Sequence, residues 1–330
     1  MRATEICVPG FEEVYRLDDP LGFVALHRCR RAAAFGGTRI RAYASPDEAL
    51  HDALRLAEAM TRKYAINGLP FGGGKAVLVQ QAIGDRADAL NALGDFVESL
   101  GGRFITGSDL GVTEADVQLM AGRTSYIECR DGAEATSDSV FYAIQAALEF
   151  CRGSDSLQDR TIAIQGVGAV GSRLAVKCIE ASAHVIAADT DAARIAALSA
   201  AVPVKPCPPD EILRIQADVL APCAVGGVIR GHDVEALRCA ILCGGANNIL
   251  DRDETGDALA ARSILYIPDF LANSGAAVEG AWTQLSGPGD YQPQVAAIGR
   301  RVREVLEEAK RTSVSPLAAA LRKTAAQAAR

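Results

Sequence analysis

The chain has 330 residues, of which 49% are hydrophobic, and this is enough for two domains that each bury a core. Its formal net charge of -7 and its lack of a basic stripe argue against a nucleic-acid partner. Apolar stretches are interrupted well before the roughly 20 residues that cross a bilayer, and the first residues lack the features of a secretory signal. We therefore expect no membrane partner and a cytoplasmic protein.

The residues that most often bind metals are scattered. Nine cysteines occur without CxxC pairs, so we expect reduced thiols. Four histidines form no pair with zinc-ligand spacing, and we predict no metal site. Proton transfer would then fall to Lys, Asp, Glu or Tyr.

The first third of the chain alternates strands and helices. A strand is predicted over 23–29, and a helix begins after Ser45, a good N-cap whose capping box is completed by Glu48. This helix carries Lys63 near its far end. A turn at 67–70 and a glycine-rich loop at 72–74 then lead to Lys75 and a strand over 76–79, followed by a helix over 86–100 and a strand over 103–106. The alternation is typical of an α/β layer.

We expect the boundary with a second domain within a polar segment at 130–138. A helix over 138–151 precedes strands at 161–165, 184–188, 219–221, 240–243 and 264–267, with helices at 171–181 and 191–200. This series predicts a Rossmann doubly wound parallel sheet. We expect an α/β protein with a substrate and oligomerisation domain at 1–135 and a dinucleotide-binding domain at 136–289. We expect a cleft between the two domains, and C-terminal helices at 290–330 that pack back on the first domain.

A GxGxxG motif at 166–171 follows an apolar strand and opens a helix. Glycines let the backbone approach a pyrophosphate, and the helix N-terminus favours its charge. A second strand ends at Asp189, whose carboxylate suits ribose hydroxyls and repels a 2′-phosphate. Because Thr190 and Asp191 offer no arginine to neutralise such a phosphate, we predict NAD rather than NADP. Asp189 could alternatively be only a helix N-cap.

A possible catalytic group follows the glycine run. A Walker A loop is excluded because Ala76 stands where Ser or Thr would bind magnesium. Two lysines facing one pocket would lower each other's pKa, so that one acts as a base and the other holds a substrate carboxylate. Lys63, Lys75 and Asp109, which follows a predicted strand, are the candidates. A surface lysine and a turn aspartate are the alternative interpretation.

Several segments in order resemble the glutamate/leucine/phenylalanine/valine dehydrogenase family. They are AFGGTR (34–39), MTRKYAINGLPFGGGKAVLV (60–79), ITGSDLG (105–111), GVGAVG (166–171), APCAVGGVI (221–229), GGANNIL (244–250) and PDFLANSGAA (268–277). The resemblance implies reversible NAD-dependent oxidative deamination of an L-amino acid to a 2-oxo acid and ammonia. It makes Lys75 the catalytic base, Asp109 the proton shuttle and Lys63 the carboxylate ligand.

The resemblance also distributes binding roles. The predicted substrate-binding residues are Lys63, Gly36, Gly37, Asn248, Phe35, Gly107, Ala277 and Gly280. The predicted cofactor-binding residues are Gly166, Gly168, Ala169, Val170, Gly171, Asp189, Thr190, Ser139, Ala221, Pro222, Cys223, Ala246, Asn247 and Asn273. Ser139 stands where leucine and phenylalanine dehydrogenases have a threonine that bonds the nicotinamide amide.

The substrate side chain is expected to be apolar. Glutamate-specific relatives have a lysine at the position of Phe35, and without it a charged side chain would be buried unpaired. The small residues Gly107, Ala277 and Gly280 favour a phenylalanine-like substrate, although Phe35 takes up part of the room and the glycines could serve only helix packing.

Other interpretations stay open. They are a branched-chain (leucine or valine) dehydrogenase and a catalytically silent NAD-binding relative. Because the C-terminal region is shorter than in leucine dehydrogenases, we expect a homodimer or a higher homo-oligomer rather than their octamer.

Overall fold

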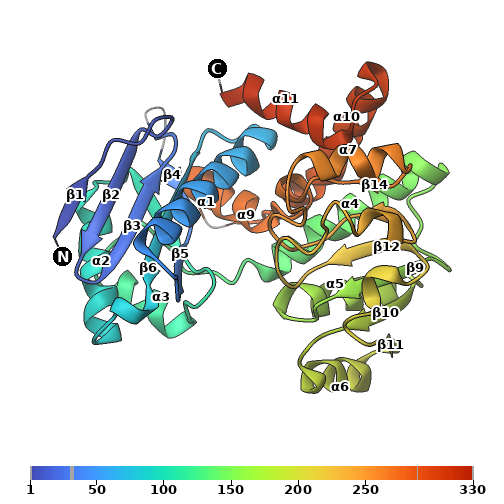
Figure 1. Cartoon of the computed structure of the whole chain (residues 1–330), viewed down its shortest axis with the longest axis horizontal. Helices are drawn as coiled ribbons and strands as arrows, with labels where there is room; N and C mark the ends of the chain where they lie inside the picture. Colours follow the sequence, from blue (N-terminus) through green and yellow to red (C-terminus); the bar gives the residue numbers. More distant parts are fainter. Residues whose placement is uncertain (1, 30–32, 288, 329–330) are drawn as a thin grey trace. The chain divides into compact units, whose positions relative to one another are not determined.

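The computed structural model describes residues 2–29, 33–287 and 289–328. The chain divides into two compact units, one ending at Asp131 and the other beginning at Gly132. Each unit is an α/β layer structure, and the second holds a parallel sheet of the Rossmann type (Figure 1). The predicted fold class is confirmed.

The first unit is built on a mixed sheet with the strand order β1-β2-β3-β6-β4-β7-β8, and β5 also pairs with β6. The contacts among β1, β2, β3 and β6 are antiparallel, whereas β4, β5, β7 and β8 pair in parallel. The strands are β1 (Ala3–Glu5), β2 (Glu13–Asp18), β3 (Leu21–Leu26), β4 (Ala34–Phe35), β5 (Thr38–Arg41), β6 (Gly72–Val79), β7 (Phe104–Gly107) and β8 (Ile127–Glu128). The helices are α1 (Pro46–Ile66), α2 (Arg86–Ser99) and α3 (Glu114–Ala121), with a short 3-10 turn η1 (Gln80–Ala82).

Helix α1 forms where it was predicted. Ser45 accepts a hydrogen bond from the Glu48 N–H, and Pro46 occupies the first turn. The Glu48 carboxylate accepts from the N–H of Ala44, one residue before the N-cap. Buried residues of α1, among them Ala53, Ala57 and Tyr64, pack the helix along β6 (Figure 1).

The glycine run 72–74 is part of strand β6 and not a loop, so that prediction was wrong. A Cβ at Gly72 would lie 1.3 Å from the Arg28 carbonyl oxygen, and one at Gly73 would lie 1.9 Å from the Ala57 carbonyl oxygen. A Cβ at Gly74 would lie 2.6 Å from the Phe104 ring. Glycine in a strand interior marks such close approach. The three glycines therefore let β6 pack tightly against its neighbours and against the backbone of α1.

The second unit has a parallel sheet in the order β11-β10-β9-β12-β13-β14. Counted from β9, this is the 3-2-1-4-5-6 order of a dinucleotide-binding sheet, in which the order reverses between β9 and β12. The strands are β9 (Thr161–Gln165), β10 (His184–Ala188), β11 (Val204–Pro206), β12 (Ala217–Pro222), β13 (Cys239–Leu242) and β14 (Leu265–Tyr266). The helices are α4 (Ala133–Arg152), α5 (Ala169–Glu180), α6 (Ala192–Ala201), α7 (Glu254–Ala261), α8 (Asp269–Ala272), α9 (Gly275–Ser286), α10 (Gln292–Thr312) and α11 (Pro316–Ala328), and η2 (Ile212–Arg214) and η3 (Val234–Ala236) are 3-10 turns.

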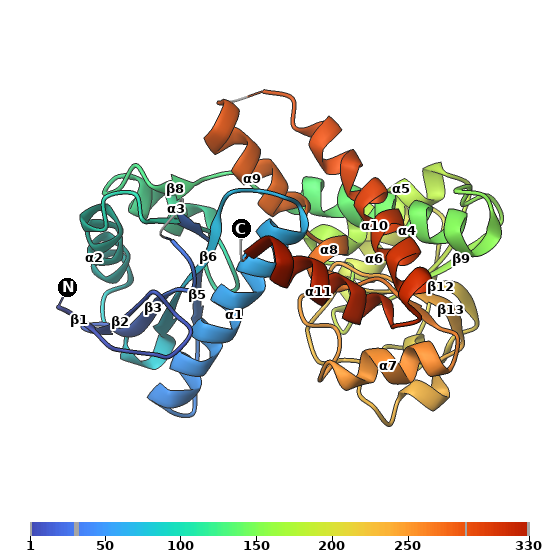
Figure 2. The same cartoon turned by 90° about the horizontal axis from the view of Figure 1, so that it is seen from above.

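The C-terminal helix α10 packs within the second unit. Helix α10 lies against α4, as Figure 2 shows. Its buried apolar residues, including Val295, Ile298 and Val302, account for this packing. Residues up to Ala326 group with the second unit.

None of the helices in the described ranges is long and apolar enough to cross a membrane.

Candidate active site

Lys75 lies in the middle of β6 and is buried there. It stands opposite Ala25 of β3, and its side chain is 7% exposed. Its Nζ lies 2.8 Å from Asp109 Oδ2. A buried ammonium needs a counter-charge because desolvation disfavours the charged form. The structure thus brings together two of the residues that we predicted as catalytic.

Asp109 is positioned by backbone contacts with β5. A bridge joins Thr38 to Ser108, and the Ile40 N–H donates to the Leu110 carbonyl oxygen at 2.9 Å. A Cβ on Gly37 would lie 2.6 Å from the Ser108 carbonyl oxygen, so glycine is required for this approach. Gly37 therefore helps to place the Asp109 segment, which is a different role from the predicted substrate contact.

Two charged residues that sequence reasoning missed complete the group. Arg39 of β5 donates through Nε to Asp109 Oδ2 at 2.8 Å and through Nη1 to Asp52 Oδ2 at 3.0 Å. Asp52 lies on α1 and also accepts from the Tyr43 hydroxyl at 2.8 Å. Arg39 belongs to the AFGGTR segment. No pattern in the sequence, however, predicts that its side chain contacts Asp52 on α1.

The charges set the proton affinities of the pair. Burial lowers the pKa of Lys75, the charge of Asp109 opposes this effect, and the charge of Arg39 adds to it. Burial acts to raise the pKa of Asp109, but Lys75 and Arg39 outweigh it and hold that pKa well below its ordinary value. Lys75 therefore gives up its proton more readily than an exposed lysine, while Asp109 stays a carboxylate.

We expected Lys63 to be the cation that lowers the pKa of Lys75, but the largest cationic contribution comes from Arg39. Lys63 lies in the last turn of α1 and is half-buried. Its carbonyl oxygen accepts a hydrogen bond from the Asn67 side-chain amide at 2.8 Å. Lys63 is thus held near the C-terminal end of the helix that covers β6.

Phe35 is the last residue of β4, and Gly36 follows it. A Cβ on Gly36 would lie 1.8 Å from the Gly74 carbonyl oxygen, so this glycine permits close strand packing. The Phe35 ring stacks on Tyr64 with centroids 5.9 Å apart and meets the Phe71 ring edge-on at 5.9 Å. The three rings form a cluster, called here the aromatic wall, in which Phe35 and Tyr64 are buried, and the sequence pointed only to Phe35.

Gly107 provides less room than we expected. It pairs with Glu128 of β8, and a Cβ at Gly107 would lie 3.2 Å from the Glu128 carbonyl oxygen. The space in the Cβ direction is therefore occupied by a neighbouring strand. The Glu128 carboxylate is itself paired with Arg130, whose Nε lies 3.0 Å from Oε1.

The GVGAVG segment forms a cradle at the carboxyl end of β9. Gly166 has a φ of +89°, which suits glycine, and a Cβ on Gly171 would lie 1.9 Å from the Gly166 carbonyl oxygen. Helix α5 begins at Ala169 with no side-chain hydrogen bond at its N-cap, Gly168. The first amides of α5, including that of Val170, are therefore left to an anionic group such as a pyrophosphate.

Asp189 follows β10 and closes one side of this cradle. Its Oδ2 accepts from the Val167 N–H at 2.8 Å, and its Oδ1 accepts from the Asp191 N–H at 2.9 Å. An arginine that sequence reasoning missed, Arg194, has its Nη1 4.0 Å from Asp189 Oδ2 and its Nε 3.4 Å from Asp191 Oδ2. Thr190 lies exposed beside Asp189.

Asn273 carries a buried polar atom without a partner. Its Nδ2 donates to the carbonyl oxygens of Gly245 and Ala246 and to Asn247 Oδ1, at 3.2, 3.0 and 3.0 Å. Its Oδ1 has no hydrogen-bond partner, although the residue is only 3% exposed. A buried amide oxygen in this state is suited to accept from an amide N–H of a bound group, as in a nicotinamide. The glycine cradle and Asn273 together fit a dinucleotide.

Other predicted cofactor residues gather at the carboxyl ends of the strands. Cys223 N–H donates to the Gln165 carbonyl oxygen at 2.7 Å, and Ala246 N–H donates to that of Pro222 at 3.0 Å. Ala221 lies buried in β12. These contacts place the ends of β9 and β12 beside the loop after β13, at the point where the sheet order reverses.

Three further predicted residues occupy the second unit. Asn248 has a φ of +51°, and its N–H donates to Asp269 Oδ2 at 2.6 Å. Ala277 and Gly280 lie buried on α9, one turn apart. Their helix is packed against α4.

Ser139, which we predicted to bond the nicotinamide amide, makes two hydrogen bonds within the second unit. It is fully buried in α4, where its hydroxyl donates to the Thr136 carbonyl oxygen at 2.8 Å and accepts from the Gly275 N–H at 3.1 Å. Ser139 thus links α4 to α9.

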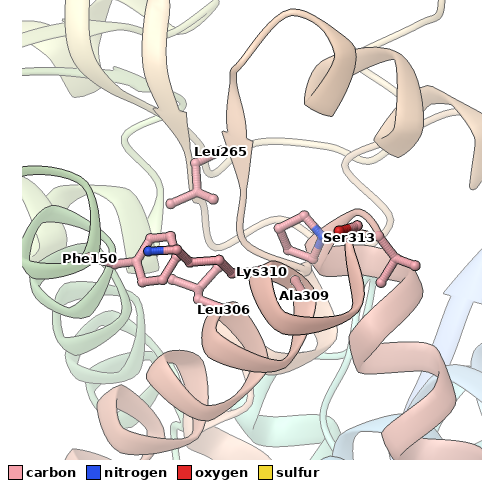
Figure 3. Close-up of a pocket in the computed structure, with 8 residues that line it drawn as sticks. Phe150, Leu265, Leu306, Ala309, Lys310 and Ser313 are labelled. Carbon is pink, nitrogen blue, oxygen red and sulfur yellow. The ribbon is translucent and has the colours of Figure 1, made fainter.

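An apolar cavity of about 350 Å³ lies elsewhere in the second unit, between α4, β14, α10 and the turn before α11. Figure 3 shows Lys310 reaching over the Phe150 ring, with its Nζ 5.9 Å from the ring centroid. The lining contains none of the predicted substrate or cofactor residues. We therefore do not assign this cavity to the active site.

A Rossmann-type sheet with a glycine cradle where its strand order reverses is typical of a dinucleotide-binding domain, and the other α/β unit holds a lysine–aspartate pair. The family model for the Glu/Leu/Phe/Val dehydrogenase dimerisation domain matches residues 15–126. The model for Glutamate/Leucine/Phenylalanine/Valine dehydrogenase matches residues 129–200 and 191–285. The chain belongs to this family, and it is an enzyme of the amino acid dehydrogenase type that acts on small molecules.

Named relatives differ in substrate. The chain is 34% identical to a phenylalanine dehydrogenase of Caldalkalibacillus thermarum over 94% of this chain and 89% of that protein. It is 35% identical to a leucine dehydrogenase of Geobacillus stearothermophilus over 77% of this chain and 72% of that protein. The crystal structure of L-tryptophan dehydrogenase from Nostoc punctiforme superimposes with a TM-score of 0.83 at 34% identity, covering 96% of each chain.

Proposed function

We propose that this enzyme catalyses reversible oxidative deamination of an apolar or aromatic L-amino acid, with NAD as the oxidant, to a 2-oxo acid and ammonia. The observation that carries the proposal is the buried pair of Lys75 and Asp109, 2.8 Å apart. A base whose pKa is lowered by burial, beside a carboxylate, is suited to general acid–base chemistry at a carbon–nitrogen bond.

Residues of the first unit have separate roles in proton transfer and in substrate binding. NAD, held by the glycine cradle at 166–171 and by Asn273, would supply a hydride acceptor, and loss of the hydride from Cα would turn the neutral amine of the substrate into an iminium. Neutral Lys75 then takes a proton from a water whose oxygen adds to the iminium carbon. Asp109 relays that proton from Lys75 to the nitrogen of the resulting carbinolamine. Lys75 then takes the hydroxyl proton as the carbon–oxygen double bond forms and the carbon–nitrogen bond breaks to release ammonia. Lys63 holds the substrate carboxylate beside Gly36.

We propose NAD rather than NADP because of Asp189. A 2′-phosphate would meet a carboxylate that already accepts two backbone hydrogen bonds. Arg194 does not reverse this preference, because it pairs with both Asp189 and Asp191. The carboxylate instead suits the ribose hydroxyls.

The aromatic wall of Phe35, Tyr64 and Phe71 supports an apolar substrate side chain. A phenylalanine-like side chain is our first choice. A specific observation favours the second candidate, leucine or valine: the space beside Gly107 is filled by Glu128. Since one methylene is worth only about 1–3 kcal/mol in discrimination, the substrate ranges will overlap.

Steady-state rates over a panel of L-amino acids, with NAD and with NADP, test the proposal through the absorbance of the reduced cofactor. We expect the highest kcat/KM for phenylalanine with NAD and the lowest for glutamate. A highest kcat/KM for leucine or valine would select the second candidate. The absence of turnover with every amino acid and with the 2-oxo acids plus ammonia would overturn the assignment.

We further propose that the enzyme is at least a homodimer. The support is the family model over residues 15–126, which is described as a dimerisation domain. Light scattering after size-exclusion chromatography would give the mass directly, and a monomer at micromolar concentration would contradict the proposal.

A further inference from the structure

Arg39 joins two buried carboxylates behind the Lys75–Asp109 pair. Its side chain is 11% exposed, and it donates to Asp109 Oδ2 at 2.8 Å and to Asp52 Oδ2 at 3.0 Å. β5 is fixed in the sheet by its parallel pairing with β6, where Arg39 stands opposite Val77. The guanidinium therefore reaches Asp109 from a rigid strand.

Asp52 is itself held in place from two further sides. Its Oδ1 accepts from Arg55 Nη2 at 2.8 Å, and its Oδ2 accepts from the Tyr43 hydroxyl at 2.8 Å. If Arg39 turned away from Asp52, a buried carboxylate would lose one of its cations, which is costly. Asp52 thus fixes the guanidinium that contacts Asp109.

We propose that Arg39, anchored by Asp52, is a positioning residue that fixes Asp109 against Lys75 and controls when this pair takes up or releases a proton. The proposal rests on the proposed deamination chemistry at Lys75 and Asp109. It adds two residues that touch neither the substrate nor the cofactor.

The contacts of Asp109 explain how this control works. Lys75 and Arg39 both bind Oδ2, and the described residues place no hydrogen bond from another side chain on Oδ1. Oδ1 is therefore the oxygen that exchanges a proton with water or with the leaving nitrogen, while Oδ2 keeps the carboxylate in place. Asp109 is 21% exposed, which permits such exchange.

The charges that act on Lys75 have opposite signs. From the elements packed around β6 they are Asp109 in the loop after β7, Arg39 on β5 and Asp52 on α1. Arg39 lowers the pKa of Lys75, whereas Asp109 and Asp52 raise it. Removal of Arg39 should therefore raise the pKa of Lys75, and removal of Asp52 should lower it.

The test compares the pH dependence of kcat in Arg39→Gln, Arg39→Lys and Asp52→Asn. If neutral Lys75 is the base, Arg39→Gln moves the acidic limb of the profile to higher pH by about one unit. It also lowers kcat by roughly 10- to 100-fold, because Asp109 is no longer held. Arg39→Lys restores part of kcat, and added guanidinium restores part of the activity of Arg39→Gln. Asp52→Asn keeps one acceptor oxygen for Arg39 and Tyr43, loses the acceptor for Arg55, and moves the limb to lower pH.

The control variant is Arg103→Lys, which alters an ion pair with Glu13 at the opposite end of β7. This variant keeps the wild-type pH profile. Arg39→Gln and Asp52→Asn profiles that match the wild type, or that shift in the same direction, would overturn the proposal. So would a loss of kcat that guanidinium and Arg39→Lys leave unchanged.

A second readout needs no turnover. The chain has only six lysines, at positions 63, 75, 177, 205, 310 and 323, so ¹³Cε-lysine NMR can follow Lys75 directly once Lys75→Arg assigns its signal. The Lys75 titration should move up in Arg39→Gln and down in Asp52→Asn. If the wild type deaminates no amino acid but these shifts occur, the proposed function fails and the role of Arg39 stands. If the enzyme is active and the Lys75 signal titrates identically in all variants, only the role of Arg39 fails.

Discussion

Replacing Lys75 by methionine separates the contribution of the Lys75–Asp109 pair to catalysis from its contribution to the free energy of unfolding. Removing one partner of a buried ion pair costs about 3–5 kcal/mol when the other charge is left unpaired. Here Asp109 keeps the Arg39 Nε at 2.8 Å, and the desolvation cost of the ammonium disappears at the same time. We therefore expect a loss of only about 1–2 kcal/mol in the free energy of unfolding.

The catalytic loss should be much larger than the loss of stability. A general base contributes roughly 10²- to 10⁴-fold, which corresponds to about 2.7–5.4 kcal/mol of activation free energy. The assay measures kcat from the absorbance of NADH at saturating substrate, and urea unfolding followed by circular dichroism gives the stability. The two numbers together show whether Lys75 serves chemistry or only folding.

Lys177→Met is the matched control for this experiment. Lys177 pairs with Glu134 at 2.6 Å and with Asp138 at 2.7 Å, so the same substitution removes a lysine from two carboxylates in the second unit. We expect kcat close to that of the wild type. A Lys75→Met enzyme that keeps more than about a tenth of the wild-type kcat would refute a role as general base. An equal loss of kcat in Lys177→Met would show that the assay reports folding.

Three further predictions address cofactor choice, the pocket and acid stability. Asp189→Ala should raise the KM for NAD by at least about tenfold and improve the use of NADP, because the repelling carboxylate is removed and Arg194 keeps only Asp191 as a carboxylate partner; unchanged NAD and NADP kinetics would contradict the role of Asp189. Phe35→Leu should raise the kcat/KM for phenylalanine relative to leucine by about tenfold, since it removes a ring from the aromatic wall, and an unchanged ratio would place Phe35 outside the pocket. The depressed pKa of Asp109 means that its contribution to stability is present above its ordinary value of about 4 and is lost as the pH falls below that value. Urea titrations between neutral and acidic pH should therefore show the wild type more stable than Asp109→Asn near neutrality and the difference shrinking in acid, and a constant difference would refute the linkage.

Local patterns predicted much of the fold. The start of α1 was predicted from Ser45 and Pro46, and its buried face from its apolar stripe. The strand–glycine–helix–strand succession over 161–188 predicts the first βαβ unit of the second sheet, which the structure contains. The hairpin of β1 and β2 was missed because the edge strand β1 has only three residues and β2 mixes charged with apolar residues. Its pairing with β3 depends on partners that a local window does not see.

The candidate site was predicted in part because its central residues carry strong sequence signals. Lys75 follows three glycines, and Asp109 follows a strand end. Arg39 and Asp52 carry no such signal, since an aspartate on an amphipathic helix usually faces solvent. The sequence likewise did not show that the Ser139 hydroxyl bonds Thr136 and Gly275. Residue type can be taken from sequence, whereas the available hydrogen-bonding capacity depends on packing.

The glycine run explains how the buried charges come to lie together. A side chain at Gly73 would collide with the backbone of α1 at Ala57, so glycine there lets the helix sit directly on β6. α1 also carries Asp52, and only a helix that lies this close to the sheet can present its carboxylate to the guanidinium of Arg39. The same packing excludes water from Lys75, which strengthens every charge interaction around it. The glycines of the GGGK motif therefore serve packing as well as catalysis, because they allow α1 to lie close to β6. α1 carries Asp52, which binds Arg39, and Arg39 in turn holds the Asp109 carboxylate that faces Lys75.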